Sequence, residues 1–294
     1  MHILRIPGLA VLVLAICSIA SSQTSSLSRI DSTDSLRIFL PTAAGQSNNF
    51  FDAAGAPQPG EQHSAATSPR SSEGSSQGLL LRAVKRGLRD QGELYAAPFH
   101  RSNFKWDALT LLGTGVLIGT DRQTSRALPT GHLQLYRDIS NIGLGGTAGS
   151  AGAIWAYGIK KPSDHAKETG ELELETLANT FLIYTPLQFI AGRERPGEGT
   201  GNGRFWRHGG FNTSFPSGHA MFTWSMATVI AHEYPKPWVK WLAYGAATSA
   251  SVGRFLGRQH YASDVFFGSV LGYAIATHLF HAHCDPQFST ACTR

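Results

Sequence analysis

Three short segments of the chain carry residue types that together can hold and attack a phosphate-like oxyanion. The first ends in Arg195-Pro196, the second is Pro216–His219, and the third contains Arg254, His260 and Asp264. Guanidinium groups bind phosphate oxygens in pairs, and an imidazole near neutral pH can act as a nucleophile or as a proton donor. The residue types therefore predict phosphoryl chemistry, provided that the fold brings the three segments together.

The turn Pro216–His219 precedes an apolar segment that begins near Ala220. Pro, Ser and Gly favour a tight turn, and the free amide groups at the N-terminus of the following helix form an anion site. The Ser217 hydroxyl adds a donor, and a protonated His219 can give its proton to a leaving oxygen. Taken alone, the same residues are also typical of an ordinary N-cap turn beside a surface histidine.

The arginines upstream of this turn lie beside Pro196, which is expected to end an apolar helix. Arg195 faces the Gly-rich loop 197–203 and is the first candidate phosphate ligand. Arg193 lies two residues earlier, so on a helix it would point elsewhere. Two arginines at a helix end are also a common complement to the helix dipole.

The downstream segment supplies one more cation and a histidine with a carboxylate. Asp264 follows His260 by four positions and opens the last apolar segment. We expect Asp264 to accept the Nδ1–H of His260, which leaves Nε2 free to attack, while Arg254 contributes another donor for oxyanions.

The combination and order of these segments resemble the type-2 phosphatidic acid phosphatase and vanadium haloperoxidase superfamily. The resemblance implies an all-α fold, a six-helix bundle, and phosphoryl transfer that needs no metal. It implies that His260 attacks phosphorus to form a phosphohistidine and that Asp264 orients it. His219 then protonates the leaving alcohol. The implied phosphate-binding residues are Arg195, Arg254, Ser217, Gly218 and, at the position of the signature lysine, Gln188.

Two positions depart from the superfamily signature. The lysine seven residues before Arg195 is Gln188, and the serine before Arg254 is Gly253. Glutamine can donate a hydrogen bond but brings no charge, so we expect weaker oxyanion stabilisation, roughly tens- to a thousand-fold in rate. The loss of the serine hydroxyl is the milder change.

The composition fits closely packed helices in or near a membrane. The chain has 294 residues, of which 42% are apolar, 15% are charged and 32 are glycine, against about 25% charged in average globular proteins. The net charge of +5 is not gathered in a basic run beside aromatic residues, so we expect no nucleic-acid partner.

A membrane bundle with a polar interior and a soluble helical domain both fit six apolar segments, at about 106–120, 139–159, 172–192, 219–234, 237–252 and 264–282.

The chain divides into five predicted parts. Residues 1–22 have the basic start, apolar core and small residues of a signal peptide, with an uncleaved anchor as the alternative. A low-complexity segment, 23–78, is predicted to be disordered, and an amphipathic lead-in, 79–104, carries Leu80, Val84 and Leu88 at helical spacing. This lead-in fits a membrane surface or an ordinary surface helix. The helical domain, 105–283, and a tail, 284–294, complete the chain.

Export to an oxidising compartment would allow a disulfide between Cys284 and Cys292, although two free thiols fit the sequence as well. The sequence thus predicts an exported phosphatase of the acid type, which acts without a cofactor on phosphate monoesters at the outer (periplasmic) side of a membrane. Lipid phosphates are the expected substrates. One alternative is a haloperoxidase with vanadate bonded to His260. The other is a phosphate- or lipid-binding protein in which Gln188 has weakened catalysis.

Overall fold

The computed structural model describes residues 73–210 and 212–292, with side chains from residue 84 onward, and the regular secondary structure in this part of the chain is all helical. The predicted signal peptide and most of the predicted disordered segment lie outside the described residues. In chain order the elements are α2 Glu73–Ala96, the 3-10 turn η1 Ala97–Phe99, α3 Phe104–Ala127, α4 Leu133–Lys160, α5 Asp164–Ala191, α6 Gly218–Glu233, α7 Pro237–Leu256 and α8 Ala262–His283.

The all-α class is confirmed, and each of the six predicted apolar segments lies in one of the helices α3 to α8. The described part of the chain contains one helix more than the predicted bundle of six, because the lead-in forms α2. This helix begins at Glu73, inside the segment predicted to be disordered. Helix propagation is cooperative, so the leucine-rich part of α2 can extend the helix into a polar sequence.

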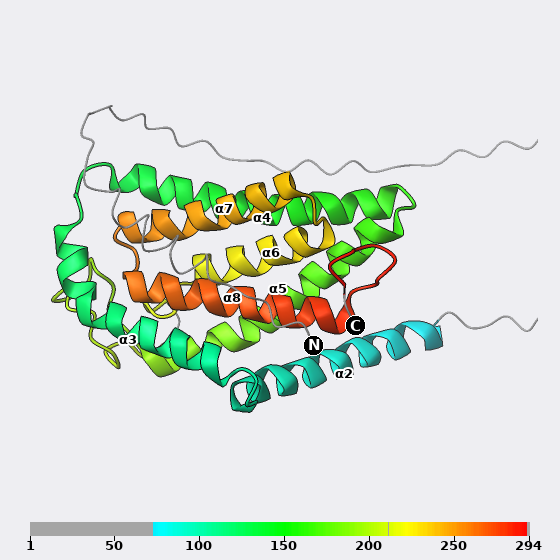
Figure 1. The fold of residues 1–294 in the computed structure, drawn as a ribbon, viewed down its shortest axis with the longest axis horizontal. Helices are drawn as coiled ribbons and strands as arrows, with labels where there is room; N and C mark the ends of the chain where they lie inside the picture. The colour runs from blue at the N-terminus through cyan, green and yellow to red at the C-terminus, as the bar shows by residue number, and fades with distance from the viewer. Residues whose placement is uncertain (1–72, 211, 293–294) are drawn as a thin grey trace, which may run out of the picture. The chain divides into compact units, whose positions relative to one another are not determined.

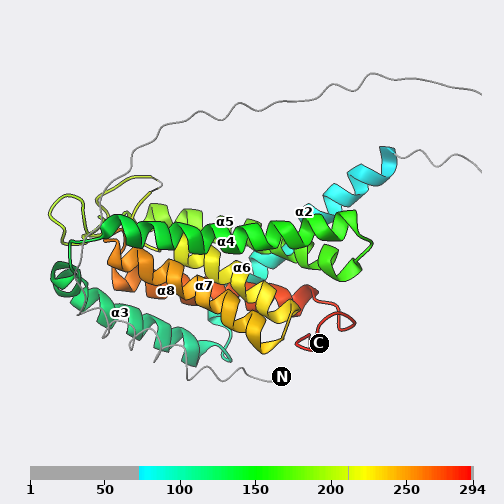
Figure 2. The same ribbon diagram turned by 90° about the horizontal axis from the view of Figure 1, so that it is seen from above.

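Helix α6 is the centre of the bundle. Twelve of its 16 residues are buried, and a helix that is apolar or small on every side needs neighbours all round. It packs against α4, α5, α7 and α8, and Figure 1 shows it between α7 and α8. Figure 2 shows α3 along α8, on the side away from α4. The N-terminus of α6, which carries the Pro216–His219 turn, is therefore surrounded by the ends of other helices.

Small residues allow these helices to approach closely near the turn. A Cβ atom on Gly268 of α8 would lie 2.7 Å from the carbonyl oxygen of Ser217, and one on Gly143 of α4 would lie 2.9 Å from the Cβ of Ala250 in α7. Neither position has room for a side chain. The glycines of α4 and α8 thus bring both helices against the elements that carry the candidate site.

Helix α3 turns its polar side inward and its apolar side outward. Its buried residues are Thr114, Asp121 and Ser125, whereas Leu112 and Val116 are 67% and 68% exposed. A similar tendency occurs in α4 and α5. Ile142 and Phe181 are exposed there, and the buried side chains include serine, threonine and asparagine, although α5 also buries Leu172 and Ile183. Polar inside and apolar outside is the pattern of helices whose surroundings are apolar.

By length and composition alone, α8 is the one described helix that could cross a membrane. However, 44% of the apolar stretch of α8 is buried inside the bundle, and core helices of soluble proteins have the same composition. Helix α8 is therefore weak evidence for a membrane span. The outward apolar faces of α3, α4 and α5 carry more weight.

Both ends of the described chain are attached to the bundle. In α2, Val84 and Leu88 of the predicted apolar stripe are exposed, whereas Asp90 and Gln91 are buried. Gln91 Nε2 donates to Asn179 Oδ1 of α5 at 2.6 Å.

At the C-terminus, Cys284 and Cys292 form a disulfide. Of the two alternatives that the sequence left open, a disulfide and two free thiols, the structure has the disulfide.

Candidate active site

His260 lies in the short loop between α7 and α8 and is 4% exposed. Its Nδ1–H donates to the carbonyl oxygen of Ser214 at 2.7 Å, which fixes the tautomer and leaves the lone pair on Nε2. Burial lowers the pKa of His260 well below its usual value, and the charge of Arg195 lowers it further. The neutral imidazole is the form that a nucleophile requires.

Asp264 does not accept directly from His260, and the predicted hydrogen bond is wrong. Its Oδ2 lies 3.9 Å from His260 Nδ1. This oxygen instead accepts from the Tyr261 amide at 2.8 Å, as part of the capping box that starts α8, and from the Ser214 hydroxyl at 2.5 Å. Asp264 therefore orients His260 through Ser214, whose side chain it holds and whose carbonyl binds the imidazole.

Arg193 is the centre of a buried ion-pair cluster that spacing alone did not predict. The guanidinium is 1% exposed. Its Nη1 donates to Asp264 Oδ1 at 2.5 Å, and its Nη2 donates to Asp121 Oδ2 of α3 at 2.8 Å. Arg193 also bonds Ser263 and packs over the ring of Tyr261, 4.4 Å from the centroid. The cluster fastens the loop after α5 to both α3 and α8.

Helix α5 ends before Arg193, and not at Pro196 as the sequence suggested, so neither Arg193 nor Arg195 lies on a helix. The last helical residue is Ala191, and Gly192 has a left-handed φ of +48°. A Cβ on Gly192 would also lie 2.6 Å from the His208 carbonyl oxygen. Glycine thus ends the helix by a left-handed C-cap. In the extended loop that follows, Arg193 points into the core and Arg195 is partly exposed.

Three arginines gather around Gln259. Its Oε1 lies 3.4 Å from Arg195 Nη1 and 3.5 Å from Arg254 Nη1. If the oxygen and nitrogen of the Gln259 side chain exchange places, the oxygen accepts from Arg137 Nη2 at 3.2 Å and Nε at 3.1 Å. Burial lowers the pKa of Arg254 to about 10, and the charges of Arg195 and Arg137 add to the effect. Cations placed this close together favour a bound anion.

His219 lies in the first turn of α6 and contacts Arg254. Its Nε2 meets Arg254 Nη2 and lies 3.2 Å from Asn141 Oδ1. A guanidinium has no acceptor, so His219 Nε2 accepts and the imidazole is neutral. Burial, then Arg254 and Arg195, lower the pKa of His219 to about 4.

Helix α4 contributes two residues to the site that the motifs did not include. Asn141 Oδ1 accepts from Arg254 Nη2 at 2.7 Å, and Arg137 lies one turn earlier on the same face. The first turns of α4 also carry the polar residues Gln134, Asp138 and Ser140, so no sequence pattern singled out Arg137 and Asn141.

Ser217 is the N-cap of α6 and is fully buried. Its amide donates to the Asp264 carbonyl oxygen at 3.0 Å. Its hydroxyl, together with the Nε of Arg195 and of Arg254, has no hydrogen-bond partner within the part of the chain that the structure describes. Buried donors are ordinarily satisfied, so each of these three groups is a candidate to bind an oxyanion.

The two departures from the signature have structural explanations. Gln188 is fully buried, its Nε2 donates to the Pro216 carbonyl oxygen at 2.8 Å, and its Oε1 accepts from the Thr213 amide at 2.8 Å. The predicted phosphate contact of Gln188 is therefore wrong, because its amide supports the turn from behind. At Gly253, a Cβ would lie 2.5 Å from the Tyr136 carbonyl oxygen, so a serine has no room there.

Residues 174–286, from within α5 to just beyond α8, match the model of the PAP2 superfamily. Over this segment, which is less than half of the chain, the sequence is similar to the PAP2 superfamily. The match confirms the resemblance and supports a phosphatase-type activity in general. The PAP2 segment contains all three motifs, whereas Asp121, Arg137 and Asn141 come from helices that precede it. No curated protein and no solved structure matches the chain.

Proposed function

We propose that the protein hydrolyses phosphate monoesters through a phosphohistidine on His260. One observation carries the proposal: a buried, neutral His260 with Nδ1 held by Ser214 lies in the field of Arg195 and Arg254, whose Nε donors have no hydrogen-bond partner in the described residues. This is a nucleophile beside donors that a bound oxyanion would satisfy.

In the first step, the lone pair of His260 Nε2 forms a bond to phosphorus while the bond between phosphorus and the leaving alkoxide breaks. The alkoxide takes a proton through His219. His219 has a pKa of about 4 in the free protein, so it carries no proton of its own near neutral pH. The proton therefore arrives on the substrate, which binds as its monoanion. Phosphate monoesters have a second pKa of about 6. In the second step, water attacks phosphorus, His219 accepts a proton, and the bond to His260 breaks.

Charge stabilisation falls to the arginine cluster and the α6 N-terminus. Arg195, Arg254 and Ser217 would bind the equatorial oxygens, together with the Gly218 amide. A Cβ on Gly218 would lie 2.9 Å from the Tyr184 hydroxyl, so a side chain here would have to displace the Tyr184 ring. Arg137 supplies a third positive charge, which offsets the absence of the signature lysine and favours an active enzyme over a binding protein that has lost turnover.

The substrate is proposed to be a lipid phosphate that reaches the site from a membrane. The support is the outward apolar face of α3, with Leu109, Leu112 and Val116 exposed, and the similar faces of α4 and α5. The Cys284–Cys292 disulfide fits an oxidising compartment. We therefore place the protein in the cell envelope, with its site on the outer (periplasmic) side. Recovery of the mature protein in the soluble fraction, rather than with membranes, would contradict this placement.

The test of the activity is release of inorganic phosphate by the purified protein from phosphatidic acid vesicles and from a water-soluble monoester. His260→Ala should abolish release from both substrates. His208→Ala is the matched control, because His208 is a half-exposed histidine that faces Glu198, and it should keep the rate. Equal release by the wild type and His260→Ala would contradict the proposal. Bromination that requires both vanadate and peroxide would instead favour the haloperoxidase alternative.

A further inference from the structure

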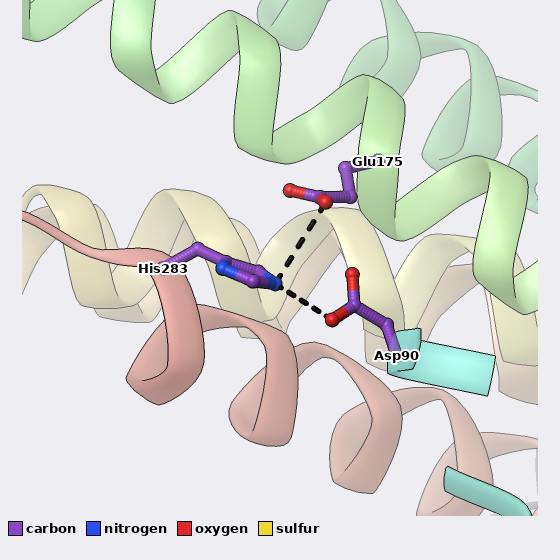
Figure 3. A group of neighbouring side chains, drawn as sticks. All are labelled: Asp90, Glu175 and His283. Carbon is purple, nitrogen blue, oxygen red and sulfur yellow. Dashed lines mark hydrogen bonds and ion pairs between the residues drawn. The ribbon is translucent and has the colours of Figure 1, made fainter. Parts of the chain in front are cut away.

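A second cluster of charged side chains lies at the opposite end of α8 from the phosphate site. It consists of Asp90 of α2, Glu175 of α5 and His283 of α8 (Figure 3). His283 is the last residue of α8, whereas His260 precedes its first residue, and the 22 residues of α8 span roughly 30 Å at about 1.5 Å each. The cluster therefore takes no part in the proposed phosphoryl transfer.

The three side chains converge on one point from three helices. His283 Nε2 lies 3.0 Å from Asp90 Oδ1 and 3.7 Å from Glu175 Oε1, and one ligand atom from each residue lies within 4.8 Å of the others. A tetrahedral zinc ion with bonds of about 2.0–2.1 Å requires ligand atoms about 3.3 Å apart. The two distances from His283 lie on either side of this value.

One oxygen of the cluster has no partner in the described residues. Asp90 is 1% exposed, and its Oδ2 makes no hydrogen bond. Figure 3 shows this second oxygen turned toward Glu175. Arg86 pairs with the other oxygen of Glu175, Oε2, at 2.7 Å and does not satisfy Asp90. Asp90 is buried and Glu175 is partly buried. A cation between the two carboxylates would compensate the negative charge of Asp90, which Arg86 leaves unpaired.

The geometry points to a binding site for a divalent transition-metal ion, of which zinc is the representative, at Asp90, Glu175 and His283. Imidazole and carboxylate together suit zinc and its neighbours, whereas calcium and magnesium prefer oxygen ligands alone. Three protein ligands leave a fourth position for water. Because the ligands come from α2, α5 and α8, the ion would clamp α2 onto the bundle.

The position of α2 is consistent with such a clamp. Val84 and Leu88 of α2 are exposed, and the residues that it buries against the bundle include the polar Asp90 and Gln91. Leu94, near the end of α2, packs against a core cluster that includes Ile183 and Leu279, so the apolar attachment of the helix is confined to its last turns. A metal bridge at Asp90 would add a second attachment.

The experiment measures zinc binding to the purified, chelator-treated full chain with its disulfide intact, by competition with a chromogenic chelator. We expect one equivalent of zinc per chain. His283→Gln and the isosteric Asp90→Asn should each weaken binding more than about 100-fold, because outer-shell partners alone typically contribute 10- to 100-fold. If His283→Gln does not fold, Asp90→Asn decides the question.

The matched control is His278→Gln. His278 lies on α8, faces Glu93 of α2 at 3.4 Å, and belongs to the same pair of helices without a second carboxylate. His278→Gln and His260→Ala should bind zinc as the wild type does. Zinc at a hundredfold excess over its dissociation constant should raise the melting temperature by about 5–10 °C and slow amide exchange in residues 84–96. No zinc binding by the wild type, or equal binding by Asp90→Asn, would overturn the inference.

Discussion

Replacement of Arg193 by alanine tests whether the buried ion-pair cluster holds the candidate site together. The change leaves Asp121 and Asp264 buried at about 1% and 0% exposure with no cation between them. It also removes the hydrogen bonds to Ser263 and to the Gly203 carbonyl oxygen. Removal of one partner from a buried pair typically destabilises a protein by about 3–5 kcal/mol. For a domain of this size, the expected loss in melting temperature is between about 6 and 20 °C.

The assay is thermal unfolding of the purified protein, followed by circular dichroism, beside the rate of phosphate release. Arg195→Ala is the matched control, two residues along the same loop. Arg195 is partly exposed and lies near two other cations, so its loss should change the free energy of unfolding by less than about 1 kcal/mol while it slows turnover at least about 100-fold. A loss below about 1 kcal/mol for Arg193→Ala, or equal destabilisation by both variants, would refute the assigned roles.

Three further predictions concern the site. Ser217→Ala should lower kcat/KM about 10²- to 10³-fold with little change in melting temperature, because the hydroxyl has no partner in the described structure; an unchanged rate would exclude Ser217 as a phosphate ligand. Gln188→Lys should destabilise the protein by about 1–3 kcal/mol and leave the rate no higher, because lysine cannot accept from the Thr213 amide; a large gain in rate would instead indicate a decayed enzyme. The pH profile follows from His219, whose pKa of about 4 in the free protein means that a productive complex must take its proton from the substrate. Since phosphate monoesters lose that proton near pH 6, kcat/KM should fall about tenfold per unit above about pH 6, whereas a constant value from about pH 5 to 8 would contradict the proton assignment.

The sequence was a good guide to the helices and to the motif residues. Apolar segments between Gly and Pro residues located α3 to α8, because Pro237 can begin a helix and Gly192 can end one. The Ser-Gly turn was correctly placed at the N-terminus of α6. Such features depend on residues near one another in the chain, which is why spacing alone could reveal them.

The contacts that position the motif residues could not be predicted from the sequence. Arg193 pairs with Asp121, 72 residues away, and no local pattern links the two. The predicted bond between Asp264 and His260 relied on their spacing of four, but the start of α8 uses Asp264 Oδ2 for the Tyr261 amide. The role of a glutamine at position 188 depended on the path of the 213–216 turn, which only the fold defines.

In the proposed reaction, phosphorus becomes bonded to Nε2 of His260. The most direct measurement is a rapid quench in alkali, where phosphohistidine is stable, after the protein is mixed with a phosphate monoester labelled with radioactive phosphorus. Peptide mapping should then place the label on His260, and His260→Ala should carry none. Label on any other residue, or substrate turnover with no alkali-stable label at early times, would contradict the account.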